Sequence, residues 1–261
     1  MVETKKGSSR FLGHDQVAGH IHVDERLPVV RLPSDQTKFR YLWLLATLLM
    51  MLILGPLVGR FQIIVGGLYV GDFVLAVVLL SAVRLLFHRH LHFLVCLLFA
   101  LVAIGAGGAS RLLDGESVTI ARVTGHASEA CLLAYLSGLI ARDIFTTDDV
   151  DFDTISGSIS IYLLLAAFFA VIFTILENLD PSAFRLPADI RISDPSLGPD
   201  RLMVYFSITT ITTLGYGDIT PRNEMARSLS NLEALLGQVY LTVLVARLVG
   251  RNLTRAFASS S

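Results

Sequence analysis

The segment with the most specific chemistry in this 261-residue sequence is residues 209–218, which read TTITTLGYGD. Hydroxyl and carbonyl oxygens can replace the water around a cation, and glycine accepts the left-handed backbone angles that turn successive carbonyls toward one axis. A bare G-Y-G would be interpreted as a turn between helices. Here it follows a threonine run and a short amphipathic segment, it is followed by an aspartate, and long apolar segments flank it. The pattern therefore predicts a strand that coordinates a cation.

Residues Asp200–Gly250 resemble the tetrameric potassium-channel family, whose selectivity filter has the pattern TVGYG. The matching residues are Thr213, Leu214, Gly215, Tyr216 and Gly217, followed by Asp218. The resemblance implies that the first four bind K⁺ through oxygens, with the Leu214 and Tyr216 side chains directed away from the ions and Asp218 at the outer mouth. Leu214 replaces the valine that is more frequent in the family. We expect selectivity to be retained, and the effect on the stability of the filter is open. One chain supplies one filter strand, so the family implies a homotetramer.

The same resemblance assigns residues Asp200–Thr212 to a short pore helix. The partially negative C-terminal end of that helix would face a central cavity and favour a cation there. Tyr205, Phe206 and Thr212 fall where the family places residues that support the filter. For the two aromatic residues, a position at the lipid interface is an equally open alternative.

The segment Ala226–Gly250 is predicted to be the inner helix. Gly237 lies at the position of a hinge glycine in the family; a glycine weakens a helix by about 1 kcal/mol relative to alanine, and close helix packing is the alternative. Helical spacing predicts one face that lines the cavity and inner gate, composed of Gln238, Leu241, Val245 and Val249. Arg247 is expected to extend to the cytoplasmic headgroups.

Glu233 is an ionisable residue inside the same apolar segment, and such residues usually have a functional reason. Two positions are open for it: behind the pore helix as a brace, or near the outer interface.

The whole sequence has the composition of a membrane protein, with 53% hydrophobic and 16% charged residues. The apolar residues fall into blocks of about 20 residues, the length of a bilayer-spanning helix. We predict an all-α integral membrane protein with a re-entrant pore helix and filter between its fifth and sixth transmembrane helices. The six predicted helices are Tyr41–Gly59, Phe61–Leu86, His92–Ala109, Val118–Ile140, Ser158–Glu177 and Ala226–Gly250.

Basic residues indicate the orientation and the division into domains. They concentrate in the N-terminal tail 1–40, in the loop after the second helix and at the C-terminus, which predicts a multi-pass protein of the cell membrane with both termini cytoplasmic. The remaining parts are a four-helix domain 41–145, a pore domain 158–250 and a short tail 251–261. That tail is too short for an attached ligand-binding domain.

The fourth predicted helix has a polar face but lacks the repeated arginines of a voltage sensor. Arg122, His126 and Glu129 share that face, and a buried, paired cluster is favoured over a modest sensor because unpaired charge is costly in a membrane. Asp72 is expected either to pair with Arg122 or to lie near the interface. Acidic residues at 148–153 are predicted to favour the N-terminus of the fifth helix.

Other functional classes have less support. A net charge of −1 gives no electrostatic basis for a nucleic-acid partner. No metal-ligand pair, nucleophile motif or phosphate loop predicts an enzyme, and no cofactor is expected apart from K⁺ as the permeant ion. The alternatives kept are a non-conducting regulatory subunit, which the intact filter disfavours, and the pore subunit of a potassium uptake transporter, a class that generally carries four pore repeats per chain.

Overall fold

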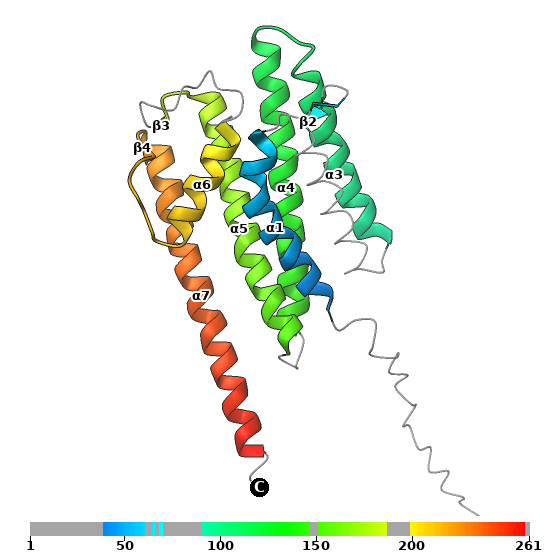
Figure 1. The fold of residues 1–261 in the computed structure, drawn as a ribbon, viewed down its shortest axis with the longest axis vertical. Helices are drawn as coiled ribbons and strands as arrows, with labels where there is room; N and C mark the ends of the chain where they lie inside the picture. The colour runs from blue at the N-terminus through cyan, green and yellow to red at the C-terminus, as the bar shows by residue number, and fades with distance from the viewer. Residues whose placement is uncertain are drawn as a thin grey trace, which may run out of the picture. The chain divides into compact units, whose positions relative to one another are not determined.

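The computed structural model describes residues 39–60, 64–65, 68–69, 90–146, 151–186 and 199–258. The predictions for Asp72, for nearly all of the N-terminal tail and for most of the second helix lie outside these residues. The described chain is mostly helical (Figure 1), and its helices are α1 Arg40–Arg60, α3 His90–Ala109, α4 Glu116–Thr146, α5 Phe152–Leu179, α6 Pro199–Ile211 and α7 Glu224–Ala258. Each overlaps a helix predicted from the sequence, and the predicted pore helix coincides with α6 to within one residue at each end.

Two short antiparallel pairs of strands correct the expectation of a purely helical protein. β1, Ile64–Val65, pairs with β2, Leu68–Tyr69, in the register Ile64↔Tyr69 and Val65↔Leu68. A helix that begins at Phe61 is therefore wrong. The sequence between the strands is Gly66-Gly67, a pair that two-residue hairpin turns favour.

Three of the described helical segments are long and apolar enough to cross a membrane: Leu91–Ala109, Phe152–Leu179 and Glu224–Gly250. The apolar described part of α1, Arg40–Ile53, is shorter. Helix α4 has 31 residues but is more polar, since charged side chains recur from its first turn to its last. The length and apolar character of the three helices, by composition alone, support a membrane protein.

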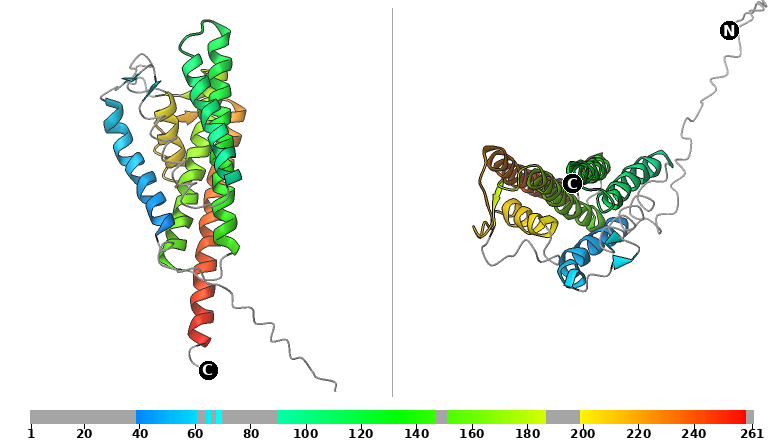
Figure 2. Two further views of the ribbon diagram at one scale, coloured as in Figure 1. Left: turned by 90° about the vertical axis from the view of Figure 1, so that its right-hand side faces the viewer. Right: turned by 90° about the horizontal axis from the view of Figure 1, so that it is seen from above.

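Helix α5 belongs to two apolar cores, one on each side. The first joins it to α1, α3 and α4, and its buried residues include Tyr41, Cys96, Leu136, Ile140 and Leu164. The second joins it to α6 and the start of α7, and includes Phe173, Phe184, Met203, Phe206 and Ala226. Seen from above, α6 and α7 lie to one side of α5 and α1 to another (Figure 2). The outer helix of the predicted pore is thus shared between the pore and the preceding helices.

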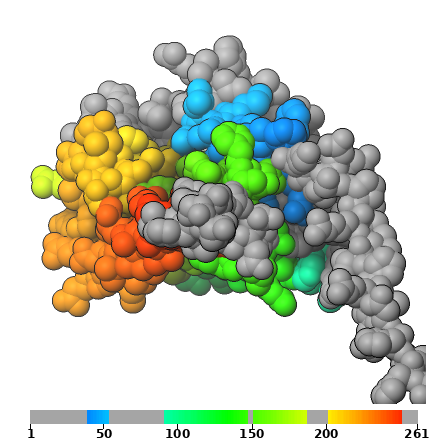
Figure 3. All heavy atoms as spheres, turned by 90° about the horizontal axis from the view of Figure 1, so that it is seen from below, coloured from blue at the N-terminus to red at the C-terminus, as the bar shows by residue number. Residues whose placement is uncertain are grey.

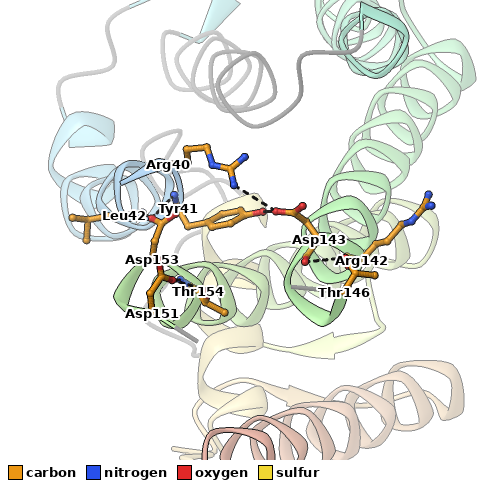
Figure 4. A network of polar contacts seen from close by, with 9 residues as sticks. All are labelled: Arg40, Tyr41, Leu42, Arg142, Asp143, Thr146, Asp151, Asp153 and Thr154. Carbon is orange, nitrogen blue, oxygen red and sulfur yellow. Dashed lines mark hydrogen bonds and ion pairs between the residues drawn. The ribbon is translucent and has the colours of Figure 1, made fainter. Parts of the chain in front are cut away.

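Carboxylates at the start of α5 fix two helix ends (Figure 4). Asp151 caps α5 itself, because its side chain accepts a hydrogen bond of 2.8 Å from the backbone N–H of Thr154. Asp153 caps a different helix: its Oδ1 accepts from the backbone N–H groups of Tyr41, at 2.9 Å, and Leu42, at 3.1 Å, in the first turn of α1. The prediction that acidic residues favour the N-terminus of this helix is confirmed for Asp151, and residues 148–150 lie outside the described part of the chain. The cap that Asp153 provides for α1 was not predicted.

Candidate functional site

The C-terminal end of α6 has the hydrogen bonds of a Schellman motif. The backbone N–H of Leu214 donates to the carbonyl of Thr209 at 2.9 Å, and the N–H of Thr213 donates to the carbonyl of Thr210 at 2.9 Å. In this motif the residue after the cap has a left-handed backbone, and Thr213 has a φ of 59°. Glycine normally occupies that position. A β-branched residue there is strained, and such strain is found mainly at functional sites.

Left-handed backbone angles then alternate along the predicted filter. Among the described residues, positive φ occurs at Thr213, at Gly215 with 54° and at Gly217 with 80°, and elsewhere only at Gly115. The sequence predicted this conformation for the two glycines, and the angles agree. The N–H of Gly215 also donates to the carbonyl of Thr209, at 3.0 Å, so one carbonyl of α6 fixes the first two residues after the turn.

Tyr205 of α6 holds the outer part of this segment. Its hydroxyl donates to Asp218 Oδ2 at 2.8 Å, and its ring is stacked on that of Tyr216 with a centroid distance of 6.4 Å and an interplanar angle of 5°. The side chain of Tyr216 is thus directed to α6. Leu214 is exposed in the single chain, and the Thr212 hydroxyl donates back to the carbonyl of Ile208.

The chain that leaves the segment is fixed to the end of α5. β4, Thr220–Pro221, pairs with β3, Phe184–Arg185, and the N–H of Arg222 donates to the carbonyl of Ala183 at 2.7 Å. Asp180 links the end of α5 to the start of α7. Its carboxylate accepts a hydrogen bond from the Ser182 hydroxyl and another, at 2.8 Å, from the side-chain amide of Asn223. These hydrogen bonds, first that from the Ser182 hydroxyl and then that from Asn223, lower the pKa of Asp180.

Phe206 is 6% exposed and packs against α5 and β3. Its ring centroid is 5.2 Å from those of Phe173 of α5 and Phe184 of β3, both in edge-to-face geometry. The two neighbouring aromatic residues of α6 therefore differ: Tyr205 contacts the filter segment, and Phe206 anchors the helix to α5 and β3.

One face of α7 packs against α5 and α6, and Glu233, Gly237 and Tyr240 are among the residues that make this contact. Gly237 lies beside the last residue of α6, Ile211, whose carbonyl accepts a hydrogen bond of 2.8 Å from the Tyr162 hydroxyl of α5. The ring of Tyr240 stacks on that of Tyr162, and its hydroxyl donates to the carbonyl of Ser158 at 2.7 Å. The contact at Gly237 accounts for the glycine by close packing, the alternative to a hinge.

Glu233 is another residue of this face, and its side chain is completely buried. Its Oε1 is hydrogen-bonded to the hydroxyl of Ser207 of α6, and the same hydroxyl lies 2.6 Å from the carbonyl oxygen of Ala166 of α5. Of the two positions that the sequence left open, the structure places Glu233 behind the pore helix.

The predicted cavity-lining face of α7 is directed away from the rest of the chain. Its residues are exposed: Gln238, Leu241, Val245 and Val249. Viewed from below, the atoms of α7, in orange to red, and of α6, in yellow, lie together at one edge of the described chain (Figure 3). This apolar face is available for a cavity or for neighbouring copies.

The polar cluster predicted on the fourth helix is smaller than expected. His126 Nδ1 and Glu129 Oε2 are 3.5 Å apart and both side chains are partly buried, whereas Arg122 is exposed. Residue 122 therefore belongs to the surface of α4 and not to a buried cluster, and a partnership with Asp72 lies outside the described residues.

The guanidinium of Arg247 is directed toward the last turn of α4, and its position at the cytoplasmic headgroups stays a prediction. It donates a hydrogen bond to the carbonyl of Ile144 and lies 5.0 Å from the ring centroid of Phe145. A cation at the C-terminal turn of a helix interacts favourably with the unpaired carbonyls there. Helix α7 is thus joined to α4.

Sequence reasoning did not identify Ser207, Tyr162 or Tyr240 as members of this site. A serine or a tyrosine in an apolar segment carries little signal by itself. The available hint was the spacing of Glu233, Gly237 and Tyr240, four and three residues apart, which places them on one helical face.

The part of the chain that contains this site is similar to known ion channels. Residues 201–254 match the model of the family Ion_trans_2, described as "Ion channel". The match begins in α6 and includes the filter segment and most of α7. Protein LctB of Bacillus caldotenax is 29% identical over 120 residues, which are 46% of this chain and 88% of that protein, and its name states no activity. The family match supports an ion-channel function for this part of the chain and, with the apolar helices, a membrane protein.

Proposed function

We propose that this protein is one subunit of a potassium-selective channel that lets K⁺ pass down its gradient. The observation that carries the proposal is the alternation of left-handed backbone angles at Thr213, Gly215 and Gly217 in a segment that directly follows a short helix. Such alternation lets successive carbonyls face the same axis, which is what a filter that replaces ion hydration requires.

The ligands in this proposal are the oxygens of the four residues Thr213–Tyr216. Thr213 contributes its hydroxyl as well as its carbonyl, and Asp218 lies at the mouth, where its charge attracts cations. The C-terminal end of α6 is directed at the start of the segment, so that its partial negative charge favours a cation. The hydrogen bond and ring stacking of Tyr205 keep the outer part from collapsing.

A single filter strand cannot enclose an ion, so we propose a homotetramer around a central axis. The exposed apolar face of α7 would line the cavity and meet its neighbours there. We further propose six transmembrane helices with both termini cytoplasmic in the cell membrane. Voltage dependence should be weak, because α4 lacks the repeated arginines that carry gating charge.

The test is K⁺ against Na⁺ flux into liposomes that contain the purified protein. Gly217→Ala, at a φ of 80°, should abolish selective flux because a Cβ disfavours the left-handed backbone. Gly115→Ala is the matched control: Gly115 also has a positive φ, of 66°, and open space around its Cα, but it lies between α3 and α4. The control should lose about 1–2 kcal/mol of stability and keep its K⁺ selectivity.

Equal K⁺ and Na⁺ flux through the unmodified protein would contradict selectivity. Absence of flux at all values of pH, voltage and divalent-cation concentration, together with an intact oligomer, would favour a non-conducting subunit.

A further inference from the structure

The buried carboxyl of Glu233 lies at the meeting point of three helices. Its Oε1 contacts the Ser207 hydroxyl of α6, and that hydroxyl contacts the Ala166 carbonyl of α5 at 2.6 Å. Ser207 and Glu233 are both 0% exposed. The second carboxyl oxygen, Oε2, is buried without a hydrogen-bond partner among the described residues.

The two hydrogen bonds of the Ser207 oxygen require a proton on Glu233. Two hydrogen bonds require two protons, and a serine hydroxyl has one. The Ala166 carbonyl can only accept, so the Ser207 proton is needed there. With Glu233 ionised, its Oε1 and the Ser207 oxygen would face each other as two acceptors. With Glu233 protonated, the carboxyl donates to Ser207, and Ser207 donates to Ala166.

The surroundings of Glu233 also disfavour its charged form. An ionised carboxylate in a buried site costs several kcal/mol unless a cation or several donors compensate it. On α6 the group that faces it is Ser207, on α5 it is the Ala166 carbonyl, and Tyr162 of α5 is a titratable side chain near it. Within the described part of the chain, no lysine, arginine or histidine forms an ion pair with Glu233.

We propose that Glu233 is a neutral carboxylic acid in the conducting channel, and that its proton positions the filter by joining α7 to α6 and α5. The proposal rests on the channel function proposed above. The path to the filter is short: Ser207 lies two residues before Thr209, whose carbonyl accepts the N–H groups of Leu214 and Gly215. Glu233 is a positioning residue, since it acts through α6 and does not touch the ion.

A neutral Glu233 predicts how the K⁺ flux depends on pH. Removal of the proton at alkaline pH replaces a donor by a buried negative charge, which separates α7 from α6. K⁺ flux should therefore fall as the pH rises, by at least about tenfold per pH unit beyond the midpoint, because the protonated fraction of each of the four copies falls by that factor. Glu233→Gln keeps a neutral side chain that can donate to Ser207, so its flux should stay constant over the same range.

The experiment combines flux with infrared spectroscopy on the assembled protein in liposomes. A protonated carboxyl gives a C=O stretch that ionisation removes, and this readout does not depend on conduction. The band should be present at neutral pH, disappear as the flux falls, and be absent in Glu233→Gln. Glu129→Gln is the matched control, a substitution of a partly buried glutamate in α4 that should leave both the band and the pH profile unchanged.

The outcomes separate the two proposals. Selective K⁺ flux with the same pH profile in the unmodified protein and in Glu233→Gln, and no band that depends on Glu233, would overturn the neutral carboxyl and leave the channel function standing. A Glu233-dependent band without selective flux would support the neutral carboxyl and contradict the channel. If Glu233→Gln does not assemble, Ser207→Ala provides the comparison: loss of its hydroxyl should shift the frequency of the Glu233 band, and an unshifted band would count against the contact.

Discussion

Gly237 of α7 lies directly against Ile211, the last residue of α6. A Cβ added to Gly237 would be 2.8 Å from the carbonyl oxygen of Ile211 and 2.6 Å from its Cγ1. The same carbonyl oxygen accepts a hydrogen bond from Tyr162. Because a backbone oxygen fixed in this way cannot move aside easily, the inner helix approaches the end of the pore helix only where it lacks a side chain.

Gly237→Ala should therefore destabilise the assembled protein, although alanine is the better helix former. We expect overpacking to cost about 1–3 kcal/mol, which exceeds the gain of about 1 kcal/mol in helix propensity. The apparent thermal midpoint of the purified protein in detergent measures the effect. Gly138→Ala, in the middle of α4 with no atom within 4 Å of the added Cβ, should be neutral or stabilising. A stabilised Gly237→Ala protein would show that the glycine is not needed for packing.

Tyr205→Phe tests the support of the outer filter. The substitution removes the hydrogen bond to Asp218 and keeps the stacking on Tyr216, so K⁺ selectivity should persist at first while flux decays faster after K⁺ is withdrawn. The time course of K⁺ flux after a period in Na⁺ measures this. Tyr135→Phe, which removes a hydroxyl that contacts His92 on the other side of the chain, is the control. Identical decay in the two variants would contradict a role for the Tyr205 hydroxyl.

The filter segment was predictable where residue type alone decides the backbone. Gly215 and Gly217 were expected to adopt left-handed angles, and they do. The same angle at Thr213 was not predicted, because it follows from the hydrogen bonds that end α6 and not from any preference of threonine. Helices α3, α5 and α7 were predictable for a similar reason: long apolar segments bounded by polar residues leave few alternatives. The short helix α6 was predicted from the family resemblance instead.

The contacts between segments far apart in sequence were not predictable. Glu233 stood out as an ionisable residue in an apolar helix, but its partner Ser207 is a common residue with no pattern around it. Arg247 was expected at the headgroups, and only the folded chain brings it to Ile144 and Phe145. The hairpin at β1 and β2 was missed because two glycines in an apolar run fit a weak helix and a turn equally well.

Asp153→Ala should loosen the start of α1 and not the start of α5, although Asp153 belongs to α5. The backbone N–H groups of Tyr41 and Leu42 lose their acceptor, and loss of a helix cap costs about 1 kcal/mol. Hydrogen exchange at these two amides should accelerate several-fold. Asp151→Ala should affect the amide of Thr154 instead, because Asp151 caps its own helix. Unchanged exchange at the start of α1 in Asp153→Ala would contradict the cap.

The contact between α7 and α4 can be measured by a double-mutant cycle of Arg247→Leu and Phe145→Leu. A cation over an aromatic ring at a partly exposed site contributes about 0.5–1 kcal/mol, so the two substitutions should be less than additive by that amount. Denaturation of the assembled protein gives the four stabilities. Arg247→Lys should recover part of the loss, because it keeps the charge near the Ile144 carbonyl and lacks the planar group that stacks on the ring. Additive effects would place Arg247 outside the contact.

Acid should loosen the outer loop through Asp180. The hydrogen bonds from Ser182 and Asn223 favour the charged carboxylate, and they lower the pKa of Asp180 below its usual value of 3.8. A group with a lowered folded-state pKa stabilises the fold above its unfolded pKa, and this stabilisation is lost as the pH falls through the folded value. The thermal midpoint should therefore drop below about pH 4, and we call this decrease the acid limb. Asp180→Asn should lower the midpoint at neutral pH and make the acid limb less steep. Asn223→Ala, which removes one donor, should move the acid limb to higher pH. Parallel acid limbs in all three proteins would show that Asp180 does not link the end of α5 to the start of α7.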